Sequence, residues 1–352
     1  MSNQATRPNS VTALAKSLSL SVGTVSQAIN GHPAVAARTR KRVMEAALKA
    51  GYVPNRQAVA LRTQKTKVIG LLVPTLRNPI YIERVASIQE LAHEKGYEVS
   101  FATSEWRPEQ EAASARQFMG MAVDALIIDG HLGDAKDMSH SAFESLLKRG
   151  IPILQIAHGD RGVLPGVTKI SMDITSGICD AIEHLLGLGH RHIALVGIRD
   201  QPQMVHISQR RGIDKAIRNS EQDVELEYIG SEADSEKTAY DALTHRLAQP
   251  GPFPTAIQAV NDQIVPGILK ALHDHGLRVP DDVSIIGFDN LAASEYYYPS
   301  LTTVSQTHLD MGRRAVDAVI DRIENDSKRK TIALKLKLVI RQSTGPAPVA
   351  SQ

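Results

Sequence analysis

The chain of 352 residues contains a single cysteine, Cys179, and so cannot form an internal disulfide. This scarcity excludes a disulfide-stapled scaffold and fits a reducing compartment, in which Cys179 is expected to be a small buried hydrophobic residue. No run of apolar residues is long enough to span a bilayer, and no apolar signal segment opens the sequence. We therefore expect a cytoplasmic protein with no membrane partner.

The sequence also lacks the short motifs of common enzyme classes. It has no phosphate-binding loop, no glycine fingerprint for dinucleotides and no Gly-x-Ser-x-Gly nucleophile elbow. The spacing of His184, His190 and His192 matches no common metal motif. Asp281 and Asp282 fit a turn before a strand better than a catalytic pair. The sequence therefore predicts no catalytic residues, no metal site and no cofactor.

Charge is unevenly distributed, although the net charge of the chain is only +2. Residues 1–66 contain ten basic side chains and one acidic side chain, Glu45, which gives this segment +9 and leaves −7 for residues 67–352. A basic segment on an acidic body is the electrostatic pattern of a nucleic-acid-binding module joined to a second domain.

The basic segment begins with two short helices joined by a tight turn. Ser10 and Ser21 are placed to cap these helices, and Ser19 lies in the turn between them. The second helix has an inward apolar side and an outward side of small and polar residues: Val25, Ala28 and Ile29 against Val22, Gly23, Ser26, Gln27 and Asn30. A helix-turn-helix places one helix in the DNA major groove, so the pattern predicts double-stranded DNA as a partner.

A third helix is expected over residues 39–50, with Gly51 as its C-terminal stop. The basic residues near its start are suited to phosphate contact: Arg38, Arg40, Lys41 and Arg42. The alternative interpretation is a charged helix face that is merely solvated.

From Lys67 onward, apolar runs alternate with amphipathic helical stretches. Buried parallel strands are expected over 68–73, 98–103, 125–129, 153–156, 193–196, 256–260 and 283–288. Covering helices are expected over 82–95, 109–121, 176–188, 262–275 and 309–323. This alternation predicts a doubly wound α/β body, long enough for two lobes with a ligand cleft at the carboxyl ends of the strands.

Several segments, in order and at matching spacing, carry a family resemblance. They include Ser21-Val-Gly-Thr-Val-Ser-Gln-Ala-Ile-Asn-Gly31, Gly51-Tyr-Val-Pro-Asn55, Ile69-Gly-Leu-Leu-Val-Pro74, Ala259-Val-Asn-Asp262 and Leu301-Thr-Thr-Val-Ser-Gln306, with others at 39–43, 78–79, 124–128, 150–152, 184–190 and 276–289. Together they resemble the lactose/purine-repressor (LacI-type) family of bacterial regulators over almost the whole chain. The resemblance implies an all-α helix-turn-helix head and a two-lobed, periplasmic-binding-protein-like (type I) α/β effector domain, whose chain crosses between the lobes three times.

The expected domain organisation follows from the motifs and the resemblance together. We expect a DNA-binding head over 1–54, a hinge helix and linker over 55–66, an effector-binding and dimerisation domain over 67–344, and a flexible tail over 345–352. Lobe 1 would comprise about 67–169 and 308–335, and lobe 2 about 170–304 and 336–344. A homodimer is implied because two heads would read a palindromic operator. The tail carries no heptads, so a coiled-coil tetramer is not expected.

In the head, the resemblance assigns DNA contacts. Val22, Gly23 and Gln27 hold the positions that usually choose bases. The positions that hold phosphates or the fold are occupied by Ser21, Thr24, Ser26 and Asn30, and Tyr52 and Asn55 complete this part of the DNA-binding set. Leu61, in the expected hinge helix, matches a leucine that wedges into the minor groove and bends the DNA. Without the family, Leu61 could equally be a core contact.

Two positions in the head depart from the family. Most relatives have Arg at the position of Gln27, and because Gln pairs with adenine where Arg pairs with guanine, we expect a different operator half-site. Relatives tend to have Gly at the position of Ser19. If the turn needs a positive φ there, Ser costs about 1 kcal/mol. The alternative is a slightly relaxed turn.

In the body, the resemblance implies an effector site between the lobes. Its expected lining is Asn78, Ile80, Tyr81, Gln209, Arg210, Asn261, Asp289 and Gln306. Polar groups of this kind can bond to the hydroxyls of a polyol, and Tyr81 can stack on its apolar face. An alternative for Asp289 is a loop residue that caps the following helix. Because Ala157, Gln209 and His308 depart from family positions, we expect a sugar or a sugar acid, the acid being held by Arg210 or a nearby histidine.

The sequence thus predicts a sequence-specific DNA-binding transcriptional regulator, a repressor, whose operator affinity is controlled by a small metabolite through linkage between the two sites. An activator or dual regulator of the same family is the alternative. A solute-binding protein would need a signal peptide and no basic head. A sugar kinase or isomerase would need a phosphate loop or an acid/base pair.

Overall fold

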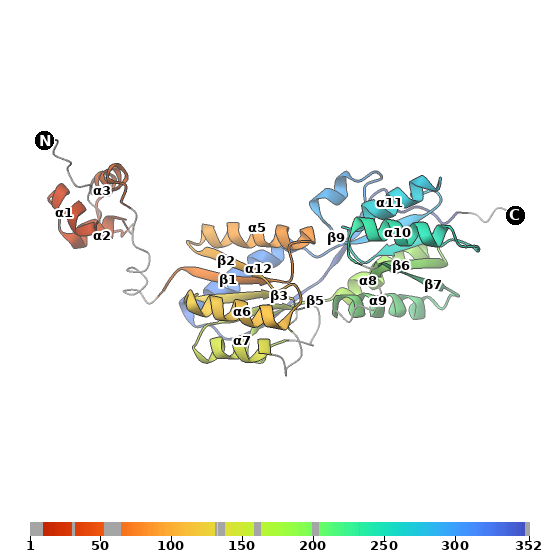
Figure 1. Cartoon of the computed structure of the whole chain (residues 1–352), viewed down its shortest axis with the longest axis horizontal. Coiled ribbons are helices and arrows are strands. Elements are labelled where there is room, and N and C mark those ends of the chain that lie inside the picture. Colours follow the sequence, from red (N-terminus) through yellow and green to blue (C-terminus); the bar gives the residue numbers. More distant parts are fainter. Residues whose placement is uncertain are drawn as a thin grey trace. The chain divides into compact units, whose positions relative to one another are not determined.

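The computed structural model describes residues 10–29, 32–52, 65–130, 132, 138–157, 163–198, 204–231 and 233–348. The chain divides into two compact units, Met1–Thr66 and Lys67–Gln352, which are coloured from red to blue along the sequence in Figure 1. Each unit has its own hydrophobic core, so each is held together independently.

The described residues of the first unit, the head, form the helices α1 (Val11–Leu18), α2 (Val22–Ile29) and α3 (Ala37–Ala50). The two predicted caps are confirmed. Ser10 Oγ accepts a hydrogen bond from the Ala13 N–H at 3.1 Å, and Ser21 Oγ accepts one from the Thr24 N–H at 3.0 Å. These bonds satisfy amide groups that a helix start leaves without partners. The helices bury a small core that includes Leu14, Val25, Ala28 and Val43, and two of these, Val25 and Ala28, were expected to face inward.

The turn of the head contains one strained residue. Ser19 has φ 53° and ψ 41°, in the left-handed region, and its N–H bonds to the end of α1. Of the two alternatives for this turn, the structure therefore adopts the positive φ. Helix α3 begins at Ala37, two residues before the expected start, and ends as predicted at Gly51, whose φ is 63°.

The second unit, the body, is built from two six-stranded sheets. The first contains β1 (Val68–Val73), β2 (Glu98–Thr103), β3 (Ala125–Asp129), β4 (Ile153–Ala157), β5 (Thr168–Met172) and β11 (Thr331–Leu334). The second contains β6 (His192–Ile198), β7 (Glu225–Ser231), β8 (Ala256–Ala259), β9 (Ser284–Asp289), β10 (Thr302–Ser305) and β12 (Lys337–Val339). Strand orders are β11-β5-β4-β3-β1-β2 and β12-β10-β9-β8-β6-β7, with β12 antiparallel to β10.

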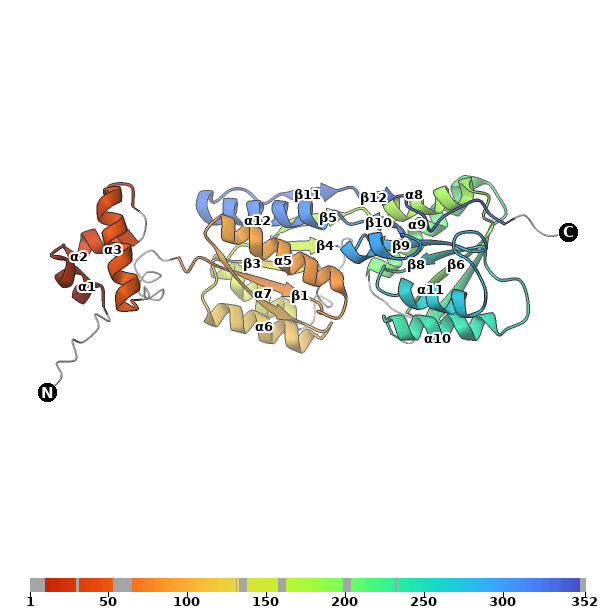
Figure 2. The same ribbon diagram turned by 90° about the horizontal axis from the view of Figure 1, so that it is seen from above.

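Helices cover both faces of each sheet (Figures 1 and 2). In the first lobe, α5 (Pro79–Glu94) packs with α12 (His308–Asn325), and α6 (Pro108–Gly120) packs with α7 (Met138–Lys148). In the second lobe, α8 (Ile174–Gly187) packs with α9 (Met204–Ser220), and α10 (Glu236–Leu247) packs with α11 (Val265–Asp274). A 3-10 helix, η1 (Ala292–Tyr296), follows β9. This is the doubly wound architecture that the sequence predicted.

The chain crosses between the sheets after β5, after β10 and between β11 and β12. Strand β5 continues to Met172, so the first crossing comes a few residues later than the boundary of about 169 that we expected. Each sheet has a switch in strand order beside its first strand, between β1 and β3 and between β6 and β8. Ligands of doubly wound proteins bind outside the carboxyl ends of the strands at such switch points.

Two expectations for the first lobe need correction. Residues 98–103 were expected to form a buried strand, but β2 is an edge strand, and Phe101 on it is 46% exposed. A strand at the edge of a sheet has a neighbour on one side only, so its side chains are less covered than those of a central strand. The helix expected from Ile82 begins instead at Pro79, because proline suits the first helical turn and Asn78 caps it.

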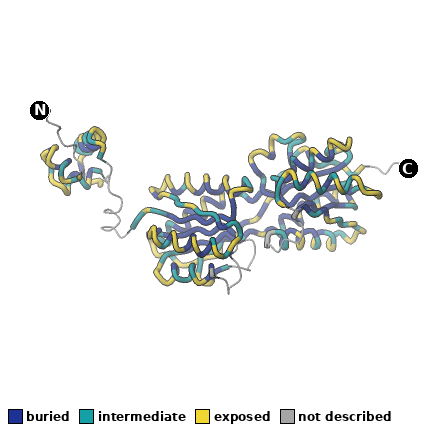
Figure 3. The backbone as a smooth tube through the Cα atoms, in the orientation of Figure 1, coloured by how far each residue is buried: buried dark blue, intermediate teal, exposed yellow. Residues whose placement is uncertain are grey.

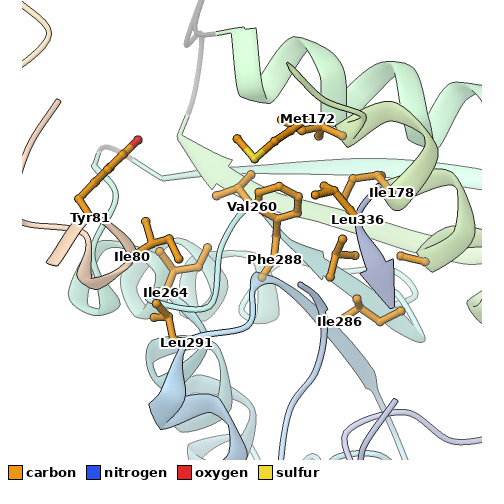
Figure 4. Packing of buried hydrophobic residues seen from close by; sticks show 14 of the residues in the cluster. Ile80, Tyr81, Met172, Ile178, Val260, Ile264, Ile286, Phe288, Leu291 and Leu336 are labelled. Atoms are coloured by element: carbon orange, nitrogen blue, oxygen red, sulfur yellow. The ribbon is translucent and has the colours of Figure 1, made fainter. Parts of the chain in front are cut away.

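The buried strands form the centre of each lobe, as the dark blue tube in Figure 3 shows. A single apolar cluster extends across both lobes. In Figure 4, Ile80 of the first lobe lies beside Ile264 and Leu291 of the second. No helix within the described ranges is both long and apolar enough to cross a membrane.

Candidate functional sites: the outer face of α2 and the polar cluster between the lobes

The outer face of α2 presents the residues expected to read DNA. Val22, Gly23 and Gln27 are exposed, and Val22 is 46% exposed although it is apolar. Ser26 and Thr24 are partly buried. Ser21 and Thr24 share a hydroxyl hydrogen bond of 2.8 Å at the start of the helix. An amide and small side chains on an exposed helix can reach base edges in a major groove.

Some of the expected DNA contacts have other surroundings. Tyr52 packs against the head core, and its N–H bonds to the Ala47 carbonyl at 2.9 Å. Asn30, Asn55 and Leu61 lie outside the described residues, as does the hinge helix expected around Leu61.

The basic residues at the start of α3 divide into two pairs. Arg42 Nη2 donates to the Leu18 carbonyl at 2.8 Å, and Arg40 Nη2 donates to the His32 carbonyl at 2.8 Å. These two guanidinium groups therefore stabilise the fold of the head and also add positive charge to it. Arg38 and Lys41 are exposed, as is Arg42, so these charges can reach another molecule.

A polar cluster that is almost completely buried joins the two lobes. Nη1 of Arg84, on α5, donates to both carboxylate oxygens of Asp129 at 2.8 and 2.9 Å. Nη2 of Arg84 donates to Oε1 of Gln306, and Nε2 of Gln306 donates to Oδ1 of Asp289. Each of these four residues is at most 4% exposed. Arg84 and Asp129 belong to the first lobe, whereas Asp289 ends β9 of the second and Gln306 follows β10.

Electrostatics in this cluster favour a charged Arg84 and resist ionisation of Asp289. Burial lowers the pKa of Arg84, but Asp129, Tyr81 and Asp289 together outweigh burial, so the pKa is raised. Burial raises the pKa of Asp289 well above its ordinary value, and the nearby Asp262 raises it further. Arg84 and the bond from Gln306 oppose that rise. Oδ2 of Asp289 has no hydrogen-bond partner among the described residues.

Asp262 lies beside this cluster, in space that is free because Gly287 has no side chain. A Cβ atom at position 287 would lie only 2.1 Å from Asp262 Oδ1, so any residue larger than glycine at this position would displace the carboxylate. Asp262 accepts bonds from Thr303 Oγ1 at 2.6 Å and from the Leu291 N–H at 3.0 Å. Burial raises the pKa of Asp262 to about 6 despite these bonds.

Two further polar groups lie at the carboxyl end of β8. Asn261 Nδ2 donates to both oxygens of Asp234 at 2.7 Å. Burial also raises the pKa of Asp234. Gln209, only 1% exposed on α9, donates from Nε2 to the Val260 carbonyl at 2.8 Å, and its Oε1 has no partner among the described residues. Asp234 and Gln209 therefore approach one end of β8 from different elements.

The remaining expected effector residues have different environments. Tyr81 is buried, and its ring meets Trp106 edge-on with centroids 6.5 Å apart. Ile80 is 2% exposed in the apolar contact between the lobes, and Asn78 Oδ1 accepts from the Ile80 N–H at 3.1 Å. Arg210 is not brought to the cluster: it is exposed and pairs with Asp214 at 2.9 Å. Neighbouring residues of a helix point about 100° apart, so the burial of Gln209 turns Arg210 away.

The structure also holds polar residues that the sequence argument missed: Arg84, Asp129, Asp234 and Asp262. A signal for the first two was present. Arg84 falls on the same helix face as Ile80 and Ile88, and Asp129 directly follows the apolar run of β3. Two opposite charges at otherwise buried positions favour a buried ion pair.

Within the described ranges, no group of three or more histidine, cysteine or acidic side chains is arranged to hold a metal ion. His190, completely buried, instead contacts Thr255 Oγ1 at 2.9 Å, and its other nitrogen lies 3.0 Å from Ser284 Oγ and from the Gly345 carbonyl. Burial lowers the pKa of His190. Its surroundings are those of a structural histidine that fastens the C-terminal segment.

An exposed helix-turn-helix face and a two-lobed ligand-binding body together define a class: regulators whose DNA binding is controlled by a small molecule. Comparison with known proteins agrees. The family model "Bacterial regulatory proteins, lacI family" matches residues 14–55, and "Periplasmic binding protein-like domain" matches residues 182–344. The transcriptional regulator DegA of Bacillus subtilis is 33% identical over 338 residues, covering 95% of this chain and 97% of DegA. Catabolite control protein A of Priestia megaterium is 29% identical, covering 94% of this chain and 98% of that protein.

Solved structures agree as well. The lac repressor dimer bound to operator and the anti-inducer ONPF superposes with a TM-score of 0.80 at 26% identity, covering 96% of this chain and 99% of that one. A LacI family regulator from Enterococcus faecium with bound ribose has a TM-score of 0.68 at 26% identity, covering 79% of this chain and 99% of that one. The chain belongs to the lacI family of bacterial regulatory proteins. It is a DNA-binding transcriptional regulator and not an enzyme.

Proposed function

We propose that this protein is a repressor that binds a palindromic operator as a homodimer in the cytoplasm and responds to a small sugar-like effector held between its lobes. The observation that carries the proposal is the combination, in one chain, of the exposed α2 face and the buried acceptor atoms between the lobes. Effector binding would change the arrangement of the lobes and, through the hinge, the affinity for DNA by a coupling free energy of about 1–3 kcal/mol.

Base recognition is assigned to Val22, Gly23 and Gln27. Backbone and phosphate contacts are assigned to Ser21, Thr24, Ser26, Asn30, Tyr52 and Asn55, and the minor-groove wedge to Leu61. The exposure of Val22 supports this assignment, since an apolar side chain on a DNA-facing helix can contact a thymine methyl group. Arg38 and Lys41 would add contacts to phosphates.

A neutral, hydroxyl-rich effector fits the inter-lobe groups better than a sugar acid does. Asp234, Asp262 and Asp289 influence one another electrostatically, and Arg84 already pairs with Asp129. Arg210, which was expected to hold an acid, pairs with Asp214 on the exposed side of α9. An anion would therefore meet carboxylates and no uncommitted cation among these groups. The ribose bound by the Enterococcus faecium regulator is a ligand of the favoured kind.

We assign the homodimer interface to one side of the body, and this surface includes elements of both lobes. The Ala292 N–H of η1 donates to Glu83 Oε1 of α5 at 3.1 Å, so these two elements adjoin, as Figure 2 shows. Exposed apolar side chains lie on and beside both elements: Ile82 at 51%, Tyr296 at 83% and Tyr298 at 94%. A groove of about 360 Å³ between α5 and β2 extends the surface, lined by Ala86, Gln89, Glu90, His93, Tyr97, Glu98 and Val99. Such exposed apolar area is typical of association surfaces.

Selection of random DNA duplexes by the purified full-length protein tests the proposal. We expect enrichment of a palindrome with a central CpG-like step, and release of that duplex on addition of neutral sugars from a panel that includes ribose, cellobiose and gluconate. Tighter operator binding in the presence of the sugar would instead assign it the role of corepressor. No enrichment at moderate salt, with or without the panel, would contradict sequence-specific binding. Reporter expression in a deletion strain separates a repressor from an activator.

A further inference from the structure

The buried chain of contacts from Asp129 through Arg84 and Gln306 to Asp289 is a direct polar connection between the two lobes. We propose that Arg84 and Gln306 are positioning residues: they hold Oδ1 of Asp289, fix the spacing of the lobes, and leave Oδ2 of Asp289 for a hydroxyl group of the effector. The inference rests on the proposed function only in treating Asp289 as an effector ligand. Below, these four residues are called the inter-lobe relay.

The geometry of the relay assigns each member a distinct task. Asp129 neutralises Arg84 through both oxygens on one nitrogen, Nη1, so that Nη2 remains for Gln306. The Gln306 amide accepts from Arg84 on one side and donates to Asp289 on the other. An amide is the side chain that can do both, because it carries an acceptor and a donor at its end. Both hydrogen bonds of Gln306 therefore point from the first lobe toward the second, since Arg84 donates to Gln306 and Gln306 donates to Asp289.

Two polar atoms of the relay lack partners among the described residues, one at its Asp289 end and one on Arg84 within it. Oδ2 of Asp289 and Nε of Arg84 are buried and have no hydrogen-bond partner among the described residues. Buried polar atoms are nearly always paired, so an unpaired carboxylate oxygen between the lobes is a place where a ligand group can supply the missing bond. A hydroxyl group could donate to Asp289 Oδ2. The effector would then bind to an oxygen whose position Arg84 and Gln306 have already set.

Helix α5 connects the inter-lobe relay to the surface assigned to the homodimer. Its buried side carries Arg84, and its outer side lines the groove assigned to the homodimer, through Gln89 and His93. A change at Asp289 would therefore reach the assigned dimer surface through one rigid helix. Glu83, next to Arg84, makes a second contact to the other lobe through the Ala292 N–H.

A pair of variants separates the relay from general packing. Gln306→Met removes the connection between Arg84 and Asp289 but keeps the Arg84–Asp129 ion pair. The matched control is Gln258→Met, because Gln258 is also fully buried and lies outside the relay. A second test is the double variant Arg84→Met/Asp129→Leu, which removes both charges of the ion pair together instead of leaving one of them buried alone.

The measurement is the distribution of distances between spin labels on the two lobes of the full-length protein, without effector or DNA. Labels are attached at Lys148→Cys and Lys237→Cys, which replace exposed side chains. Native Cys179 is buried, and burial raises the pKa of its thiol to about 11, so it reacts slowly. We expect one narrow distribution in the otherwise unmodified protein and in Gln258→Met. Gln306→Met and the double variant should give a distribution at least twice as broad, or shifted to longer distances.

Two results would overturn the inference. Narrow, unshifted distributions in both relay variants would show that the relay does not set the spacing of the lobes. Equal broadening in Gln258→Met would show that any loss of a buried amide loosens the body. Because this measurement uses neither DNA nor effector, its outcome is independent of operator selection, so failure of the relay and failure of the proposed function are distinguishable.

Discussion

Nε2 of the buried His190 lies 3.0 Å from the carbonyl oxygen of Gly345, 155 residues further along the chain. A carbonyl can only accept, so Nε2 carries a hydrogen, and Nδ1 lies 2.9 Å from the Thr255 hydroxyl. Burial lowers the pKa of His190, which favours the neutral ring in the folded protein. Burial also lowers the pKa of His206, to about 4.

These histidines predict one part of the pH dependence of stability. In the unfolded chain each takes up a proton near pH 6.5, whereas in the folded protein each resists protonation to lower pH. The unfolded state then binds more protons at these two sites, so their contribution to the free energy of unfolding falls as the pH drops from about 6.5 toward 4. The raised pKa values of Asp234, Asp262 and Asp289 act in the opposite direction, so the histidine contribution is measured by comparing the slope of Tm against pH between variants. His190→Gln should reduce the slope, and replacing the exposed His273 by Gln should not. An unchanged slope in His190→Gln would contradict this account.

Ser19 predicts a stabilising substitution in the head. Its left-handed conformation costs a residue with a Cβ atom about 1 kcal/mol, a cost that glycine avoids. Ser19→Gly should therefore slow hydrogen exchange of the head amides about fivefold in the full-length protein, as expected for about 1 kcal/mol. Ser17→Gly is the matched control, because Ser17 lies within α1, where glycine costs about 1 kcal/mol, and it should accelerate exchange. Faster exchange in Ser19→Gly would contradict the argument.

Gln27 predicts a change of base preference. Gln pairs with adenine through two hydrogen bonds, whereas Arg pairs with guanine, so Gln27→Arg should shift the preferred base at one position of each half-site. A discrimination of about 1–3 kcal/mol would appear as an enrichment ratio in duplex selection. Arg38→Ala is the comparison: loss of a phosphate contact should weaken binding to all sequences and reduce its salt dependence. An unchanged selected sequence for Gln27→Arg would exclude Gln27 from base contact.

Two exposed apolar residues, Ile82 on α5 and Tyr298 after η1, allow a test of the surface assigned to the homodimer. Ile82→Glu combined with Tyr298→Glu should convert the dimer to a monomer, because both side chains would carry like charges into the assigned interface. Sedimentation velocity measures the change, with circular dichroism to confirm folding. Tyr228→Glu is the control, since Tyr228 is 43% exposed on β7, at the edge of the second sheet. A dimer that persists in the double variant would place the interface elsewhere.

The sequence predicted the alternation of strands and helices because burial on both faces leaves continuous apolar runs, as in β1 and β3. At β2 it predicted the strand but not its exposure, because the strand lies at the edge of the sheet. Strands β5, β7, β10 and β11 were not predicted. In β5, the pattern Thr-Lys-Ile-Ser-Met buries every second residue, so no continuous apolar run marks it. Edge position depends on the order of strands, which local pattern does not contain.

The sequence by itself determined the helix caps, the basic head, the doubly wound architecture and the family, because each depends on residue types at short spacing. Only the tertiary structure decided which polar residues meet between the lobes. Arg84 and Gln306 are 222 residues apart and lie in contact because the chain crosses between the lobes after β10. Gln209 and Arg210 adjoin in sequence, yet one is buried and the other exposed. Which of two neighbouring side chains faces the interior depends on the packing of α9, and that packing is a property of the folded chain.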